Sequence, residues 1–147
     1  FAGISFQGQT EIFIFSENLN GALYVEILQD VLLPSARFLY GRHTWFLCQD
    51  NDPKHSSRVA KDCYRRRKIN LVESWPSSSP DLNPIENIWA IMKSDVGRRL
   101  PQTVQELREA ILDAWDRIPM ETIRNCIASL PSRLRDVIEN NGGKVNY

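Results

Sequence analysis

Residues 75–89 read WPSSSPDLNPIENIW, and this stretch joins a turn-rich loop directly to an apolar helix. Three of the chain's eight prolines fall within nine positions, with three serines among them. Because Asn83 is a favourable helix cap and proline suits the first helical position, a helix is predicted to begin at Pro84. Its predicted buried stripe is Ile85, Ile88, Trp89, Met92 and Val96. Glu86 then falls in the first turn of this helix.

A second carboxylate, Asp50, follows a run of strand length, TWFLCQ at residues 44–49. The run is continuously apolar at its centre, WFLC, which predicts a strand buried on both faces, and DNDP after it is turn chemistry. Ligands of α/β sheets gather at the carboxyl ends of strands. A carboxylate there, joined by a second one from a helix, suits Mg²⁺, which prefers oxygen ligands.

Both acidic residues also have purely structural interpretations, which stay open at this point. Asp50 is well placed to begin an Asx turn. Glu86 is at the third helical position after Asn83, where it would complete a capping box and suit the helix dipole. His55 is either a hydrogen-bonding residue at a helix start or a site residue. Asp52 and Asp81 are interpreted as turn residues.

The segment KHSSRVAKDCYRRRK, residues 54–68, is strongly basic although the whole chain has no net charge. It holds seven Lys or Arg against Asp62 alone and is predicted to be helical over 55–67. Such a helix either contacts phosphates or is an ordinary solvated face. The candidate nucleic-acid-binding residues are Lys54, His55, Arg58, Arg65, Arg66, Arg67 and Lys68.

The remaining patterns predict one α/β domain over residues 1–147, with its helices and strands in the order β-β-α-β-α-β-α-α-α along the chain. AGISF and TEIFIF are predicted strands of a hairpin that turns at QGQ, and INLVE at 69–73 is another strand. A helix after Asn20 is predicted to kink or end at Pro34, with Gly41 closing the segment. Thr103 and Glu106 predict a capping box for a helix with a buried stripe of Val104, Leu107, Ile111, Trp115 and Ile118. A last helical region from about residue 120 is predicted to be interrupted at Pro131 and to stop at 142–143. No apolar run approaches the length of a membrane span.

Taken together, QDNDPKHSS at 49–57 and WPSSSPDLNPIENIW at 75–89 resemble motifs of the mariner-type superfamily of cut-and-paste DNA transposases. GISFQGQTEIF, LNGALYVEIL and LLPSARFL are similar to the family's segments in the same order, so the resemblance covers at least residues 1–118. It implies a ribonuclease H-like catalytic domain, a mixed sheet flanked by helices with a helical C-terminal part. It also implies an acidic triad that binds Mg²⁺ or Mn²⁺, DNA as partner, strand cleavage and strand transfer as chemistry, and a nuclear location.

The resemblance assigns Asp50 as the second carboxylate of the triad and Glu86 as the third, both catalytic and metal-binding. The 35 residues between them are one more than the family's commonest spacing, and we place the extra residue in YRRRKIN. The family's first aspartate lies on a strand before GISFQG, where this sequence starts. We therefore expect weak metal binding and a strand gap beside residues 44–49. A second copy in a homodimer, or another partner chain, would fill it; the alternative is direct pairing of residues 1–6 with 44–49. The rival functional interpretation is a domesticated, catalytically inactive module that binds protein or nucleic acid.

Overall fold

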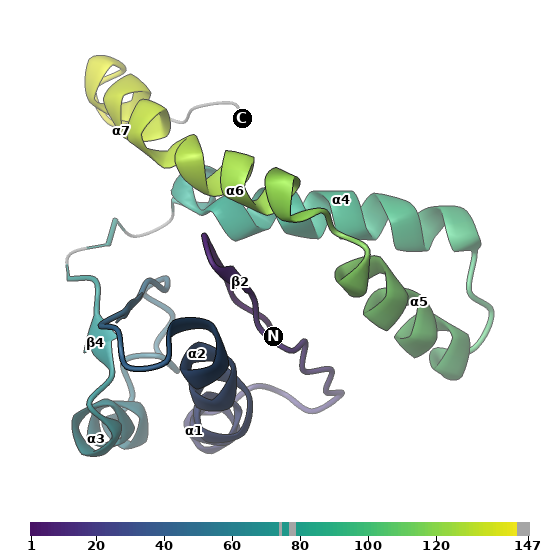
Figure 1. Cartoon of the computed structure of the whole chain (residues 1–147), viewed down its shortest axis with the longest axis horizontal. Coiled ribbons are helices and arrows are strands. Elements are labelled where there is room, and N and C mark those ends of the chain that lie inside the picture. Colours follow the sequence, from purple (N-terminus) through teal and green to yellow (C-terminus); the bar gives the residue numbers. More distant parts are fainter. Residues whose placement is uncertain (74, 77–78, 144–147) are drawn as a thin grey trace. The chain divides into compact units, whose positions relative to one another are not determined.

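The computed structural model describes residues 1–73, 75–76 and 79–143, so Ser77 and Ser78 of the proline-rich loop lie outside the described residues (Figure 1). The chain divides into two compact units. The first unit contains Phe1–Gly3 and Gln9–Ser79, and the second contains Ile4–Gly8 and Pro80–Tyr147. The predicted α/β class with a helical C-terminal part is confirmed, whereas the prediction of a single domain stays a prediction.

The N-terminal hairpin is confirmed, but it is shorter than predicted. β1 spans Ile4–Ser5 and β2 spans Gly8–Gln9, so the turn lies at residues 6–7 instead of at QGQ. The Ser5 hydroxyl accepts the N–H of Gly8 at 3.2 Å and donates to the Gly8 carbonyl at 2.9 Å, which closes the turn. The expected strand TEIFIF is wrong. The Thr10 hydroxyl takes the Gly3 N–H at 2.8 Å and so replaces a regular ladder bond.

One long helical segment follows, composed of α1 (Gly21–Ile27), the π-helical turn η1 (Leu28–Leu32) and α2 (Leu33–Tyr40). Asn20 caps it by accepting the N–H groups of Ala22 and Leu23, each at 2.9 Å. The segment does not end at Pro34. The turn before this proline is wound as a π-helix, so the Leu33 N–H reaches the Leu28 carbonyl five residues back. Gly41, with φ of 57°, ends the segment as predicted.

A parallel strand pair forms the sheet of the first unit. β3 (Phe46–Leu47) pairs with β4 (Asn70–Leu71), in the register Phe46 to Asn70 and Leu47 to Leu71. Among the described residues, β3 has β4 as its one ladder partner, so the direct pairing of residues 1–6 with 44–49 is not what forms. The core beneath the sheet consists of Tyr24, Leu28, Leu32, Ala60, Cys63, Tyr64 and Ile69.

The expectation that residues 44–49 are buried on both faces is wrong. Trp45 and Leu47 are half-buried and pack against the core, whereas the Phe46 side chain between them is 63% exposed. Alternation of this kind is typical of a sheet covered on one face. The helices of this unit cover the face of Trp45 and Leu47, and Asp50 continues the exposed row.

Helix α3 (Arg58–Arg67) begins later than predicted because Ser57 caps it, accepting the Ala60 N–H at 3.3 Å. It approaches the start of α1 very closely. A Cβ atom at Gly21 would lie 2.7 Å from the Ser57 Oγ and 2.9 Å from a methyl group of Val59. A side chain at position 21 would therefore require the side chains of Ser57 and Val59 to shift.

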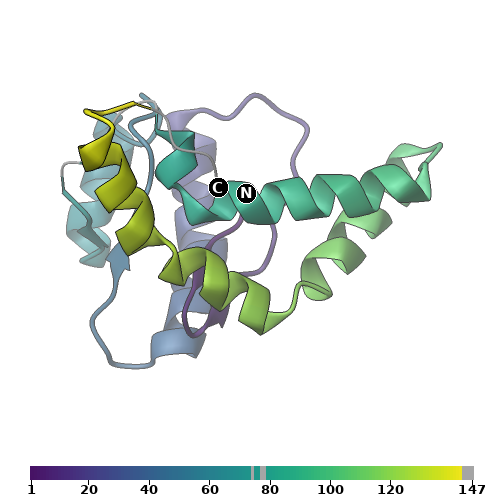
Figure 2. The same ribbon diagram turned by 90° about the horizontal axis from the view of Figure 1, so that it is seen from above.

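The second unit contains the 3₁₀ turn η2 (Pro80–Leu82) and four helices, α4 (Pro84–Arg99), α5 (Val104–Asp116), α6 (Met120–Ala128) and α7 (Leu130–Glu139) (Figure 2). Trp89 of α4 stacks on Trp115 of α5 with ring centroids 5.5 Å apart. Of the predicted stripe of α4, Ile88 and Met92 are buried, and Ile85, Trp89 and Val96 are half-buried. Pro131 lies in the first turn of α7, at the predicted interruption. No helix of the described part of the chain is both long and apolar enough to cross a membrane.

Two details of α5 differ from the prediction. Val104 and Leu107 are 84% and 40% exposed, because the buried face of this helix starts only at Ala110. The cap also forms in a variant way. Thr103 accepts the Glu106 N–H at 3.1 Å as expected, but the Glu106 carboxylate accepts the N–H of Gln102 at 2.7 Å.

Candidate metal-binding and nucleic-acid site

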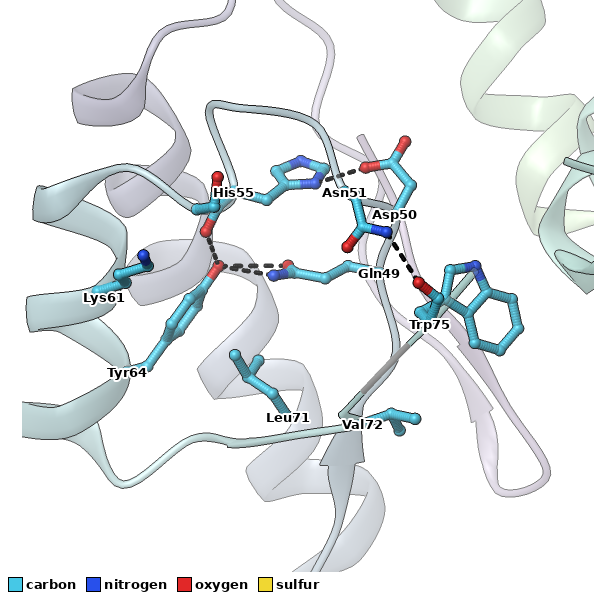
Figure 3. Close-up of a pocket in the computed structure, with 10 residues that line it drawn as sticks. Gln49, Asp50, Asn51, His55, Lys61, Tyr64, Leu71, Val72 and Trp75 are labelled. Atoms are coloured by element: carbon cyan, nitrogen blue, oxygen red, sulfur yellow. Dashed lines mark hydrogen bonds and ion pairs between the residues drawn. The ribbon is translucent and has the colours of Figure 1, made fainter. Parts of the chain in front are cut away.

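The Asp50 carboxylate has one oxygen held by the protein and one left open. Its Oδ1 accepts the backbone N–H of Asp52 at 3.1 Å, which is the predicted Asx turn. Nδ1 of His55 lies 2.7 Å from the same oxygen, close enough for an ion pair if protonated, although outside hydrogen-bond geometry (Figure 3). Oδ2 has no hydrogen bond to any described residue, and the side chain is 63% exposed. The turn role and a ligand role are therefore compatible.

A buried polar network supports the turn that carries Asp50. The Gln49 amide lies between two tyrosines, accepting from the Tyr24 hydroxyl and donating to the Tyr64 oxygen at 2.9 Å. Tyr64 in turn donates to the His55 carbonyl at 2.9 Å (Figure 3). Burial raises the pKa of both tyrosine hydroxyls, so they remain neutral donors. Gln49, Tyr24 and Tyr64 were not among the sequence-based candidates, although the position of Gln49 next to Asp50 was a usable signal.

Asp50 is one of the residues that line a pocket of about 230 Å³ in the first unit (Figure 3). Lys61 supplies a cation to its lining and Trp75 an aromatic ring. The Asn51 side chain donates to the Trp75 carbonyl at 2.8 Å, which ties the Asp50 turn to the segment after β4. The complete lining is Gln49, Asp50, Asn51, His55, Ser56, Lys61, Tyr64, Leu71, Val72 and Trp75.

Lys54 and Asp52 form a local pair in the turn after Asp50. Their side chains are 2.8 Å apart, and the Lys54 N–H also donates to Asp52 at 2.8 Å. These hydrogen bonds from Lys54 hold the pKa of Asp52 below its usual value. The interpretation of Asp52 as a turn residue is confirmed.

The basic residues of α3 are exposed. Arg65 pairs with Asp62 at 2.8 Å, and Arg67 donates to Gln29 of η1 at 2.9 Å. Arg58, Arg66 and Lys68 are also exposed. These side chains are accessible to a phosphate backbone, and their role in binding nucleic acid stays a prediction.

Glu86 is in the first turn of α4, and its side chain is exposed. Asn83 caps the helix by accepting the Ile85 N–H at 3.4 Å. The capping-box interpretation of Glu86 is wrong, because its carboxylate makes no hydrogen bond to any other residue that the structure describes. Asp50 and Glu86 belong to different units, so their predicted proximity stays a prediction. No group of three potential metal ligands was found among residues 1–73, 75–76 and 79–143.

Sequence comparisons identify related proteins. The family model described as DDE superfamily endonuclease matches residues 1–108. The Tcb1 transposase of Caenorhabditis briggsae is 40% identical over 126 residues, which are 85% of this chain and 45% of that protein. The Tc3 transposase of Caenorhabditis elegans is 37% identical over 139 residues, 93% of this chain and 42% of that protein. The chain thus spans less than half the length of these relatives.

Among solved structures, the catalytic domain of Mos1 mariner transposase matches with a TM-score of 0.80 over 89% of this chain and 66% of that one. At 19% identity, this likeness establishes the ribonuclease H-like fold alone. The family model and the sequence identities to the transposases also show the family. The chain belongs to the DDE superfamily endonucleases, as a domain of the mariner/Tc1 transposase type.

Proposed function

We propose that this chain is a transposase-derived catalytic domain whose ancestral chemistry is DNA strand cleavage and strand transfer, with Asp50 and Glu86 as ligands of Mg²⁺ or Mn²⁺. The observation that carries the proposal is the Asp50 carboxylate. The Asx turn holds Oδ1, and Nδ1 of His55 lies 2.7 Å from that oxygen, while Oδ2 has no hydrogen bond to a described residue. Metal-ligating carboxylates are commonly oriented by second partners in this way.

The donor set fits a hard divalent cation, since both residues offer exposed carboxylate oxygens. Solved structures of the Mos1 catalytic domain with Mg and with Mn support the same choice of metals. A bound metal would supply charge stabilisation and activation of the attacking oxygen in phosphodiester chemistry. The part of this chain is to hold Asp50 through His55 and the tyrosine network, and to present Glu86 at a helix start.

DNA is the proposed partner. Mos1 structures similar to this chain include a strand transfer complex and paired-end complexes. The exposed cations of α3 give this chain a surface for the phosphate backbone, which binds mainly by charge and without sequence preference. Action on chromosomal DNA would require a nuclear location in a eukaryotic host.

The alternative function is a domesticated module that binds nucleic acid or protein without catalysis. Isothermal titration calorimetry with Mn²⁺ measures whether the chain and its variants bind the metal. We expect Asp50→Asn and Glu86→Gln each to weaken Mn²⁺ binding, whereas Asp116→Asn on the exposed part of α5 leaves it unchanged. DNA nicking by the longest natural chain that carries this sequence then decides. Metal binding without nicking would favour the inactive module. If Asp50→Asn changed neither Mn²⁺ binding nor DNA nicking, the assignment of Asp50 as a metal ligand would be refuted.

A second copy of the chain is the proposed partner at the sheet edge. β3 pairs with β4 on one side, and no described strand pairs with its other side. An exposed strand edge is a template for a further strand, and symmetric homodimers are the commonest oligomers. Light scattering after size exclusion should show a dimer that Phe46→Pro weakens. A monomer at all concentrations would refute this proposal.

A further inference from the structure

A buried guanidinium group lies in the second unit, close to the start of α4. Arg133 of α7 is 2% exposed, which is rare for a charged side chain unless its donors are satisfied. Its Nε donates to the Ser129 hydroxyl at 2.8 Å, within the same helical region. Nη1 donates to the Asp81 carbonyl at 2.8 Å, and Nη2 donates to the Asn87 side chain at 2.6 Å.

The two terminal nitrogens of Arg133 therefore bind a residue that precedes Glu86 in the sequence and a residue that follows it. Asp81 is in the 3₁₀ turn that precedes α4, and Asn87 directly follows Glu86 in its first turn. Because the guanidinium is planar, its two contacts fix the 3₁₀ turn and the helix start relative to each other. Glu86 itself remains exposed, with its backbone held between these two anchored residues.

We propose that Arg133 is a positioning residue that sets the orientation of Glu86 for metal binding, an inference that rests on the proposed function. A merely structural role explains the burial less well. An apolar residue would attach α7 without the cost of desolvating a charge. The guanidinium instead directs two of its donors to the segment that presents the carboxylate. Arg133 also lies outside residues 1–108, the part that the family model covers.

The test compares Arg133→Lys and Asn87→Ala with Arg135→Lys, which changes an exposed arginine on the same helix. Lysine keeps the charge but lacks the planar fork, and Asn87→Ala removes one contact in case the first variant folds poorly. The first readout is amide hydrogen exchange. Faster exchange is expected over residues 82–88 in both test variants, with α5 and the Arg135→Lys protein unchanged.

The second readout is Mn²⁺ affinity with and without Glu86→Gln. Since partners of metal ligands typically contribute 10–100-fold, Arg133→Lys should weaken binding about tenfold in the parent and less than about twofold beside Glu86→Gln. An equal effect in both backgrounds, or unchanged exchange over 82–88, would overturn the proposal. If Glu86→Gln alone leaves Mn²⁺ affinity unchanged, the proposed function is wrong at Glu86, and the inference that Arg133 positions a metal ligand falls with it, whatever the exchange shows.

Discussion

The imidazole of His55 lies against the ring of Tyr24, with centroids 4.4 Å apart and planes tilted by 38°. The Tyr64 hydroxyl binds the backbone carbonyl of the same histidine. His55 is thus held at its ring and at its backbone, while its Nδ1 faces Asp50 at 2.7 Å. Two core residues, Tyr24 and Tyr64, therefore position His55 next to the candidate metal ligand Asp50.

Removal of the Tyr64 hydroxyl should destabilise the chain. Tyr64→Phe leaves the His55 carbonyl and the Gln49 amide short of a partner in a buried setting, at a cost of about 1–3 kcal/mol in the free energy of unfolding. Urea denaturation measures the change. Tyr40→Phe is the control, because its hydroxyl has no hydrogen bond to the described residues. Equal effects of the two substitutions would contradict the role of the network.

Asp50 and Glu86 should approach each other in an experimental structure with Mn²⁺. Each metal–oxygen contact is about 2.0–2.1 Å long and paired metals are about 3.5–4 Å apart, so the carboxylates should lie within about 8 Å. A crystal structure of the chain with Mn²⁺ gives the distance. A clearly longer separation between the two carboxylates would contradict the hypothesis that they share a metal site.

Acid should weaken an ion-pair cluster in the second unit. Hydrogen bonds from Arg98, and then from Arg99, hold the pKa of Asp95 below its usual value. The stabilisation is therefore complete above the unfolded pKa of about 3.9 and is lost as the pH falls through the lower folded value. The melting temperature of Asp95→Asn should lie below that of the parent at pH 7, and the gap should close below about pH 4. A gap that persists in acid would exclude this linkage.

Binding to duplex DNA should depend steeply on salt through α3. Each phosphate contact contributes about 0.9 to the slope of log affinity against log salt, so replacement of Arg65, Arg66 and Arg67 by Gln should lower that slope by up to about 3. Fluorescence anisotropy at several salt concentrations measures it on two unrelated sequences. Arg135→Gln in α7 is the control. A slope unchanged by the triple substitution would place the DNA contacts elsewhere.

Local chemistry explains which features were predictable from the sequence. The cap at Asn83, Pro84 at the helix start and the Asx turn at Asp50 each depend on residues within three positions. Burial was harder to predict, since the exposure of Phe46 depends on which helices cover the sheet. The hydrogen bond between Arg133 and the Asp81 carbonyl joins residues 52 positions apart, so no local sequence pattern predicts it. The distance between Asp50 and Glu86 remains a prediction.

The contact at Gly21 limits which mutations this domain can accept. A methyl group there would push against Ser57 and Val59, and moving Ser57 would release the cap of α3. That helix carries Tyr64, whose hydroxyl holds His55 beside Asp50. In a saturation mutagenesis library selected for DNA cleavage, substitutions at position 21 should therefore be depleted, even though glycine contributes no functional group.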